Sequence, residues 1–192
     1  MNHSAAAIRK PSSSARTGRF AITVVSAFLL GLCLVSISRA QKPTWRQATD
    51  AELAALLPAR APVEKEHIET EMRTASGVTD GKGHFIAGVV LITAGYSADG
   101  KYSHFLVVQS PIKVAGISLA PGEYVFGWQR NKDGDALNVH LHEAQSGKLM
   151  GNAQAHRLTG NLRVEQLRIW PSSEKPMIQI GRFGLAYEVA EP

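Results

Sequence analysis

The chain has 192 residues, of which 44% are apolar and 19% are charged. That length suggests a single domain, and that composition excludes a disordered chain. The formal net charge of +5 comes from the first 40 residues, which hold five Lys and Arg residues and no acid. The remaining residues carry 16 basic and 16 acidic side chains, so the folded part gives no indication of a nucleic-acid partner.

Residues 1–40 have the order of a secretory signal peptide. A basic segment ends at Arg19, and an uncharged apolar run follows from Phe20 to Ile37. Ser38 and Ala40 then place small residues at the −3 and −1 positions of a cleavage site before Gln41. The pattern predicts cleavage after Ala40 and export of the rest of the chain.

An uncleaved N-terminal membrane anchor is the alternative interpretation. The apolar run of 18 residues reaches the lower limit of a membrane-spanning helix, and the basic flank would hold its N-terminus inside. Both interpretations place the domain outside the cytoplasm, in the periplasm or the extracellular space, with membrane contact only through the N-terminal segment. Because the single cysteine, Cys33, lies in this segment, the exported part has no thiol.

Residues 41–62 are predicted to be a linker followed by a short helix. Thr49 and Asp50 can cap the helix, and Glu52 lies in its first turn. Leucines at positions 53, 56 and 57 follow at helical spacing, and Pro58 ends the helix.

From His67 onward the apolar residues recur with a period of two, which is typical of strands. The nearly continuous apolar run over residues 85–93 predicts a strand buried on both faces. Between the runs lie turn pairs, mostly 10 to 20 residues apart: Asp80-Gly81, Asp99-Gly100, Pro121-Gly122, Asp133-Gly134, Ser146-Gly147 and Pro171-Ser172. Residues 63–192 are therefore predicted to form an all-β domain, an antiparallel sandwich or small barrel of eight to nine strands.

One segment, from Val114 through Gly116, Leu119 and Pro121-Gly122 to Tyr124, has the form V-x-G-x-x-L-x-P-G-x-Y. It resembles a segment of small exported bacterial β-sandwich proteins of uncharacterised function. The resemblance implies an exported β module and brings no catalytic residues.

Three aromatic residues, Tyr124, Phe126 and Trp128, share one face of a predicted strand. Such a stripe can stack on a sugar ring or line an apolar pocket, although aromatic stripes more often belong to a core. These three residues are the candidate ligand-binding residues.

His140 and His142 are the candidate metal ligands, because alternate residues of a strand point to the same face. His156 is the natural third ligand. However, a loop at Gln145-Ser146-Gly147 would pair His142 with Met150, His140 with Asn152 and His156 with Ala136. His156 would then lie roughly 13 Å along the strand from His140, too far to share one ion.

No catalytic motif accompanies these residues. The exported part contains no Cys and no G-x-S-x-G segment. We therefore expect a non-enzymatic binding or structural module of the cell envelope that needs no cofactor. Its partner would be an envelope ligand or protein: a polysaccharide, an apolar molecule or another protein. The alternative is a metal-binding protein or metal-dependent enzyme that uses His140 and His142.

Overall fold

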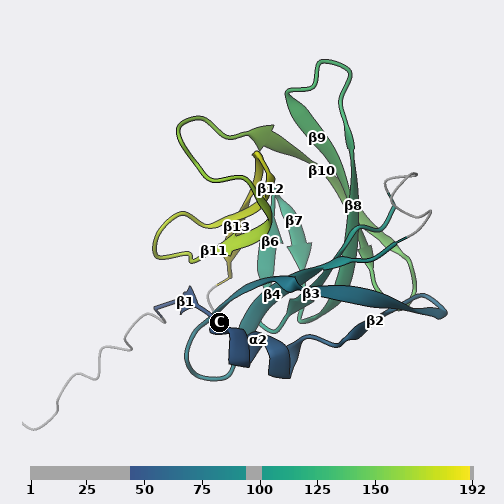
Figure 1. The fold of residues 1–192 in the computed structure, drawn as a ribbon, viewed down its shortest axis with the longest axis vertical. Helices are drawn as coiled ribbons and strands as arrows, with labels where there is room; N and C mark the ends of the chain where they lie inside the picture. The colour runs from purple at the N-terminus through teal and green to yellow at the C-terminus, as the bar shows by residue number, and fades with distance from the viewer. Residues whose placement is uncertain (1–43, 94–100, 191–192) are drawn as a thin grey trace, which may run out of the picture. The chain divides into compact units, whose positions relative to one another are not determined.

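The computed structural model describes residues 44–93 and 101–190 (Figure 1). The predicted leader, its cleavage site and Cys33 lie outside these residues. The elements, in chain order, are β1 (Arg46–Gln47), α2 (Asp50–Leu56), β2 (Arg60–Val63), β3 (Glu66–Thr79), β4 (Phe85–Leu91), β5 (His104–Val108), β6 (Ile112–Val114), β7 (Ile117–Leu119), β8 (Gly122–Arg130), β9 (Ala136–Glu143), β10 (Leu149–Arg157), β11 (Glu165–Trp170), β12 (Met177–Gly181) and β13 (Phe183–Val189). Within the described ranges, no helix has the length and apolar character needed to cross a membrane.

The strands form one antiparallel sheet that is nearly closed into a barrel, which confirms the predicted all-β class with one short helix. The strand order is β1-β3-β4-β5-β8-β9-β10-β13-β12-β11. β11, the last strand in this order, lies beside β3. The main-chain N–H of Ile169 in β11 donates to Ser76 Oγ in β3 at 2.9 Å. Of the two predicted architectures, the sheet therefore approaches the barrel.

The predicted count of eight to nine strands is too low, because the described residues form thirteen. Three of the additional elements, β1, β6 and β7, are only two or three residues long. A strand of that length is too short to show a period-two pattern. A fourth element, β2, contains Pro62. Because proline is unusual inside a strand, the sequence did not indicate a strand there.

The short helix α2 forms where the sequence predicts it. Thr49 and Glu52 make a reciprocal capping box, with the Glu52 carboxylate accepting from the Thr49 N–H at 2.8 Å. Arg46 also bonds Glu52, at 2.7 Å. The guanidinium of Arg46 is the largest cause that lowers the pKa of Glu52 to about 2, so the cap stays ionised at neutral pH.

Two hydrophobic cores lie on the two faces of the sheet. The inner core fills the barrel and includes Ile86 and Leu106. The outer core lies under α2 and β2 and includes Val89 and Phe105. Because neighbouring residues of β4 and β5 contribute to both cores, the prediction that the 85–93 run is buried on both faces is confirmed for β4.

The β6–β7 hairpin packs against the inner core beside the end of β13. It turns at Ala115 and Gly116, both in the left-handed region, and pairs with the end of β13. Its residues Ile112, Val114 and Leu119 belong to the inner core. The hairpin follows the end of β5, so it lies away from the end of the sheet where β5 begins.

Candidate functional site

A cavity of about 560 Å³ lies at the end of the sheet where β5 begins, which we call the barrel mouth. It is bounded by the ends of β4, β8, β10 and β12 and by the starts of β5, β9, β11 and β13. Fifteen of the described residues line it: Val90, Leu91, Thr93, Ser103, His104, Trp128, Arg130, Leu137, Arg157, Val164, Gln166, Ile180, Gly181, Arg182 and Phe183. The mouth of a β-barrel is one of the places where small-molecule sites are most often found.

The predicted aromatic stripe runs along β8 toward this mouth. Tyr124 and Phe126 are 5% and 2% exposed and belong to the inner core. Trp128, two residues further along the same face, is half-buried and lines the cavity. The structure therefore places only the last residue of the stripe where a ligand could contact it.

His104 lies beside this stripe and is 4% exposed. Its Nδ1 is 2.8 Å from Ser103 Oγ, which in turn donates to the Phe126 carbonyl oxygen. Burial lowers the pKa of His104 from 6.5 to about 4, and the neighbouring main chain of Gln166 opposes this shift. The imidazole is therefore neutral at pH 7.

Two buried nitrogen atoms of the cavity residues, Nε2 of His104 and Nε1 of Trp128, form no hydrogen bond of good geometry within the described residues, although the main chain of Gln166 lies close enough to His104 to raise its pKa. Leaving a buried polar atom unsatisfied costs about 1–3 kcal/mol. Such atoms are rare in native proteins, and a functional site is one of the places where they occur. Both atoms belong to residues that line the cavity, but both are buried behind its surface.

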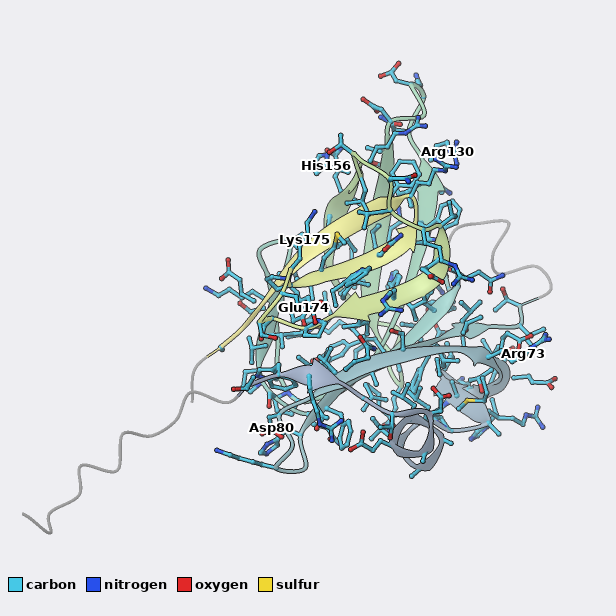
Figure 2. The ribbon with its side chains drawn as sticks, turned by 60° about the vertical axis from the view of Figure 1, so that its left-hand side comes forward. Arg73, Asp80, Arg130, His156, Glu174 and Lys175 are labelled. Carbon is cyan, nitrogen blue, oxygen red and sulfur yellow. The ribbon has the colours of Figure 1, made fainter. Side chains whose placement is uncertain are left out.

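Arg130, Arg157 and Arg182 line the outer part of the same cavity, and all three are exposed. Each lies at the end of a strand, at the last residue of β8, the last residue of β10 and the turn between β12 and β13. Figure 2 shows Arg130 at the same end of the sheet as His156, with Asp80 at the other end. We call these three residues the arginine rim.

The candidate metal ligands lie elsewhere, on the outer face of β9. His140 Nδ1 is 2.7 Å from Asn152 Oδ1, and the ring of His142 meets that of Tyr102 edge-on with centroids 5.5 Å apart. His156 is paired with Ala136, as the loop register predicts. In the part of the chain that the structure describes, no three His, Cys, Asp or Glu side chains are grouped so that they could hold a metal ion.

Sequence reasoning missed His104 and the arginine rim. His104 directly precedes an apolar run and so resembles the polar end of a strand. The arginines belong to different hairpins, and only the pairing of β8 through β13 brings them together. Only Arg130 lies near a predicted turn, Asp133-Gly134, so the sequence held no signal shared by the three arginines.

Comparison with models of protein families, with curated proteins and with solved structures finds no match to this chain. The fold and the cavity alone describe the class of the protein: an all-β domain whose antiparallel sheet is nearly closed into a barrel, with a cavity of about 560 Å³ at one end.

Proposed function

We propose that the protein is a non-enzymatic binding module of the cell envelope that holds an apolar small molecule in the barrel mouth. The observation that carries this proposal is the cavity itself. Its volume of about 560 Å³ lies within the roughly 300–1,000 Å³ of small-molecule pockets. Its inner wall is mostly apolar, with Val90, Leu137, Ile180 and Phe183 beside the ring of Trp128.

The polar groups of the inner wall support binding in preference to catalysis. His104 is neutral and buried, and its ring packs on Phe126; among the described residues that line the cavity, no carboxylate is present to orient the imidazole. Few, fixed polar groups in an apolar wall orient a ligand, which is the usual composition of a binding pocket.

The neutral dye N-phenyl-1-naphthylamine, whose fluorescence rises in apolar surroundings, tests the proposal directly. We expect the purified protein to bind one dye molecule. Val90→Trp, at a half-buried residue of the cavity wall, should weaken this binding at least about tenfold by filling the space, roughly 1.4 kcal/mol. Leu149→Trp is the matched control, because Leu149 is 49% exposed and is not one of the residues that line the cavity.

A second blocking variant, Val164→Trp, places the indole at a 51% exposed residue of the mouth, where it does not disturb the core. This variant decides the outcome if Val90→Trp does not fold. Absence of dye binding to the wild type would overturn the proposal, and so would equal dye binding by the Val164→Trp and Leu149→Trp variants.

Export to the envelope is the second part of the proposal, and the sequence of the first 40 residues supports it. Fractionation of cells followed by N-terminal sequencing tests it. Gln41 as the first residue of an exported protein supports the cleaved leader, and an intact Met1 in the membrane fraction supports the anchor. A soluble cytoplasmic full-length chain would refute both.

A further inference from the structure

The described residues of the barrel mouth carry charge of one sign. Of the fifteen that line the cavity, three are arginines and none is Asp or Glu. This contrasts with the chain after residue 40, in which basic and acidic residues are equal in number. A cavity lined by one sign of charge attracts a ligand of the opposite sign.

The strand register turns two of these arginines toward the cavity. Arg130 is paired directly with Leu137, and Arg157 is paired directly with Phe183. Side chains of directly paired residues lie on the same face of a sheet, and both Leu137 and Phe183 belong to the inner core. The guanidinium carbon of Arg130 also lies 5.5 Å from the centroid of the Phe183 ring, which links both arginines to one aromatic side chain.

The arginine rim has no ionic partner in residues 44–93 and 101–190: no ion pair or side-chain hydrogen bond involves Arg130, Arg157 or Arg182. Other arginines of the same domain are paired with carboxylates. Arg46 bonds Glu52 at 2.7 Å, and Arg73 bonds Glu71 at 3.0 Å. Within the described residues, no carboxylate therefore neutralises the rim guanidinium groups.

We propose that the ligand of the barrel mouth is an amphiphilic anion, whose carboxylate, sulfonate or phosphate head binds the arginine rim while its apolar part enters the cavity. This inference rests on the proposed function, because it specifies the chemical class of the ligand that the cavity holds. Planar guanidinium groups bind such oxyanions with two parallel hydrogen bonds, which favours arginine over lysine in this role.

Two dyes with the same apolar skeleton test apolar binding in the cavity and anion binding at the arginine rim separately. 8-Anilino-1-naphthalenesulfonate carries a sulfonate, and N-phenyl-1-naphthylamine does not. In the triple variant Arg130→Gln, Arg157→Gln, Arg182→Gln, the affinity for the sulfonate dye should fall about tenfold or more, since several exposed charge contacts are lost together. The affinity for the neutral dye should change less than about twofold.

The matched control removes three positive charges elsewhere. Arg60, Arg73 and Lys113 are exposed and lie outside the cavity, so their joint replacement by Gln changes the net charge equally. This control should keep the wild-type affinity for both dyes. A loss of sulfonate-dye affinity equal to that of the rim variant would show a general charge effect and overturn the inference.

Competition with the bound sulfonate dye tests the two parts of the ligand. Dodecanoate should displace the dye from the wild type at a concentration at least about tenfold lower than it requires in the rim variant. Dodecan-1-ol should compete equally with both proteins. Inorganic phosphate should not displace the dye beyond the effect of NaCl at the same ionic strength.

Failure of this inference is distinguishable from failure of the proposed function. If neither dye binds the wild type, the cavity is not a ligand site and both proposals are overturned. If the neutral dye binds and the rim variant retains full affinity for the sulfonate dye, the cavity binds apolar molecules whatever their charge. The proposed function then stands, and this inference is overturned. Phosphate displacement beyond the salt effect would also overturn the inference, because the rim would then be a simple anion site.

Discussion

The imidazole ring of His104 lies parallel to the phenyl ring of Phe126, with ring centroids 4.7 Å apart and ring planes at 4°. The two residues are direct partners across β5 and β8. Because Phe126 belongs to the inner core, this pairing holds a titratable side chain inside the barrel, next to the cavity.

This arrangement predicts that the protein loses stability in mild acid. The pKa of His104 is about 4 in the folded protein, below the 6.5 of an unperturbed histidine. Between these values the unfolded chain binds the proton and the folded chain does not, so the free energy of unfolding decreases as the pH falls. The loss begins near pH 6.5 and reaches about 3 kcal/mol below pH 4.

Urea unfolding at pH 7 and pH 4.5 measures this loss. In His104→Phe, which keeps an aromatic ring against Phe126, the histidine contribution should disappear and the loss should be smaller by about 2–3 kcal/mol. His67→Phe is the control, since His67 is exposed on β3 and should leave the acid sensitivity unchanged. An equally steep loss in His104→Phe and wild type would contradict the prediction.

The contact between helix α2 and the sheet depends on Gly77. A Cβ atom at this position would lie 2.6 Å from Ala87 Cβ and 2.9 Å from Leu53 Cδ2. We expect Gly77→Ala to lower the free energy of unfolding by about 1–3 kcal/mol, because both the strand β4 and the helix must shift.

Thermal or urea unfolding of Gly77→Ala beside Gly122→Ala checks this expectation. At Gly122 the nearest atoms to an added Cβ are those of Tyr124, at 3.5 Å or more, which is ordinary van der Waals contact. The control should therefore change stability little. A Gly77→Ala variant as stable as the control would show that α2 is not tightly held on the sheet.

Local features of this fold were predictable from the sequence. The cap at Thr49 was readable, because capping involves residues only three positions apart. The loop ending at Gly147, which has a φ of 67°, set the predicted pairing of His140 with Asn152. The loop does not predict the bulge between Leu149 and Gly151. Because of this bulge, His142 is paired with Leu149 and not with the expected Met150.

The closure of the sheet was not predictable in this way. The contact of Ser76 with Ile169 joins residues 93 positions apart, and no turn specifies it. The cavity depends on the same closure, because its wall includes Val90 of β4 together with Gln166 of β11 and Phe183 of β13. The aromatic stripe was visible in the sequence, but which of its residues reaches the mouth depends on the length of β8 within the barrel.

The geometry of β9 predicts that His140 and His142 do not form a metal site. Metal analysis of the purified protein should find less than one zinc or copper ion per chain, because His140 is bonded to Asn152 and no third ligand is grouped with the pair in the described residues. The double variant His140→Ala, His142→Ala should have the same metal content. Stoichiometric metal that is lost only in this variant would establish the metal-dependent alternative.

The hydroxyl group of Tyr102 is predicted to stabilise the folded protein to an extent that depends on pH. Tyr102, which is 1% exposed, donates a hydrogen bond to the carboxylate of Glu64. Glu64 also accepts from Lys101 Nζ at 3.1 Å, and its main-chain N–H donates to the Ala144 carbonyl at 2.7 Å. The side-chain contacts tie the β2–β3 turn to the segment before β5, and the main-chain contact ties it to the β9–β10 turn.

The hydrogen bond from Tyr102, followed by that from Lys101, lowers the pKa of Glu64. Its contribution to stability is therefore present above the pKa of an unfolded glutamate, near 4.3, and is lost as the pH falls through the lower folded value. At pH 7, Tyr102→Phe should lower the free energy of unfolding by roughly 1 kcal/mol, a value reduced from that of a buried charged pair because Glu64 is partly exposed.

The control is Tyr124→Phe, because the Tyr124 hydroxyl donates at 2.8 Å to the neutral carbonyl oxygen of Ala120. Its cost should be similar at pH 7 and should stay constant in acid, since its acceptor does not titrate. The cost of Tyr102→Phe should shrink as the pH is lowered from 7 toward 3, where protonation of Glu64 removes the charge that strengthens the bond. Urea unfolding of both variants and the wild type at pH 7, 5 and 3 measures this difference, and a cost of Tyr102→Phe that is constant across the series would show that the Glu64 charge contributes nothing to the link.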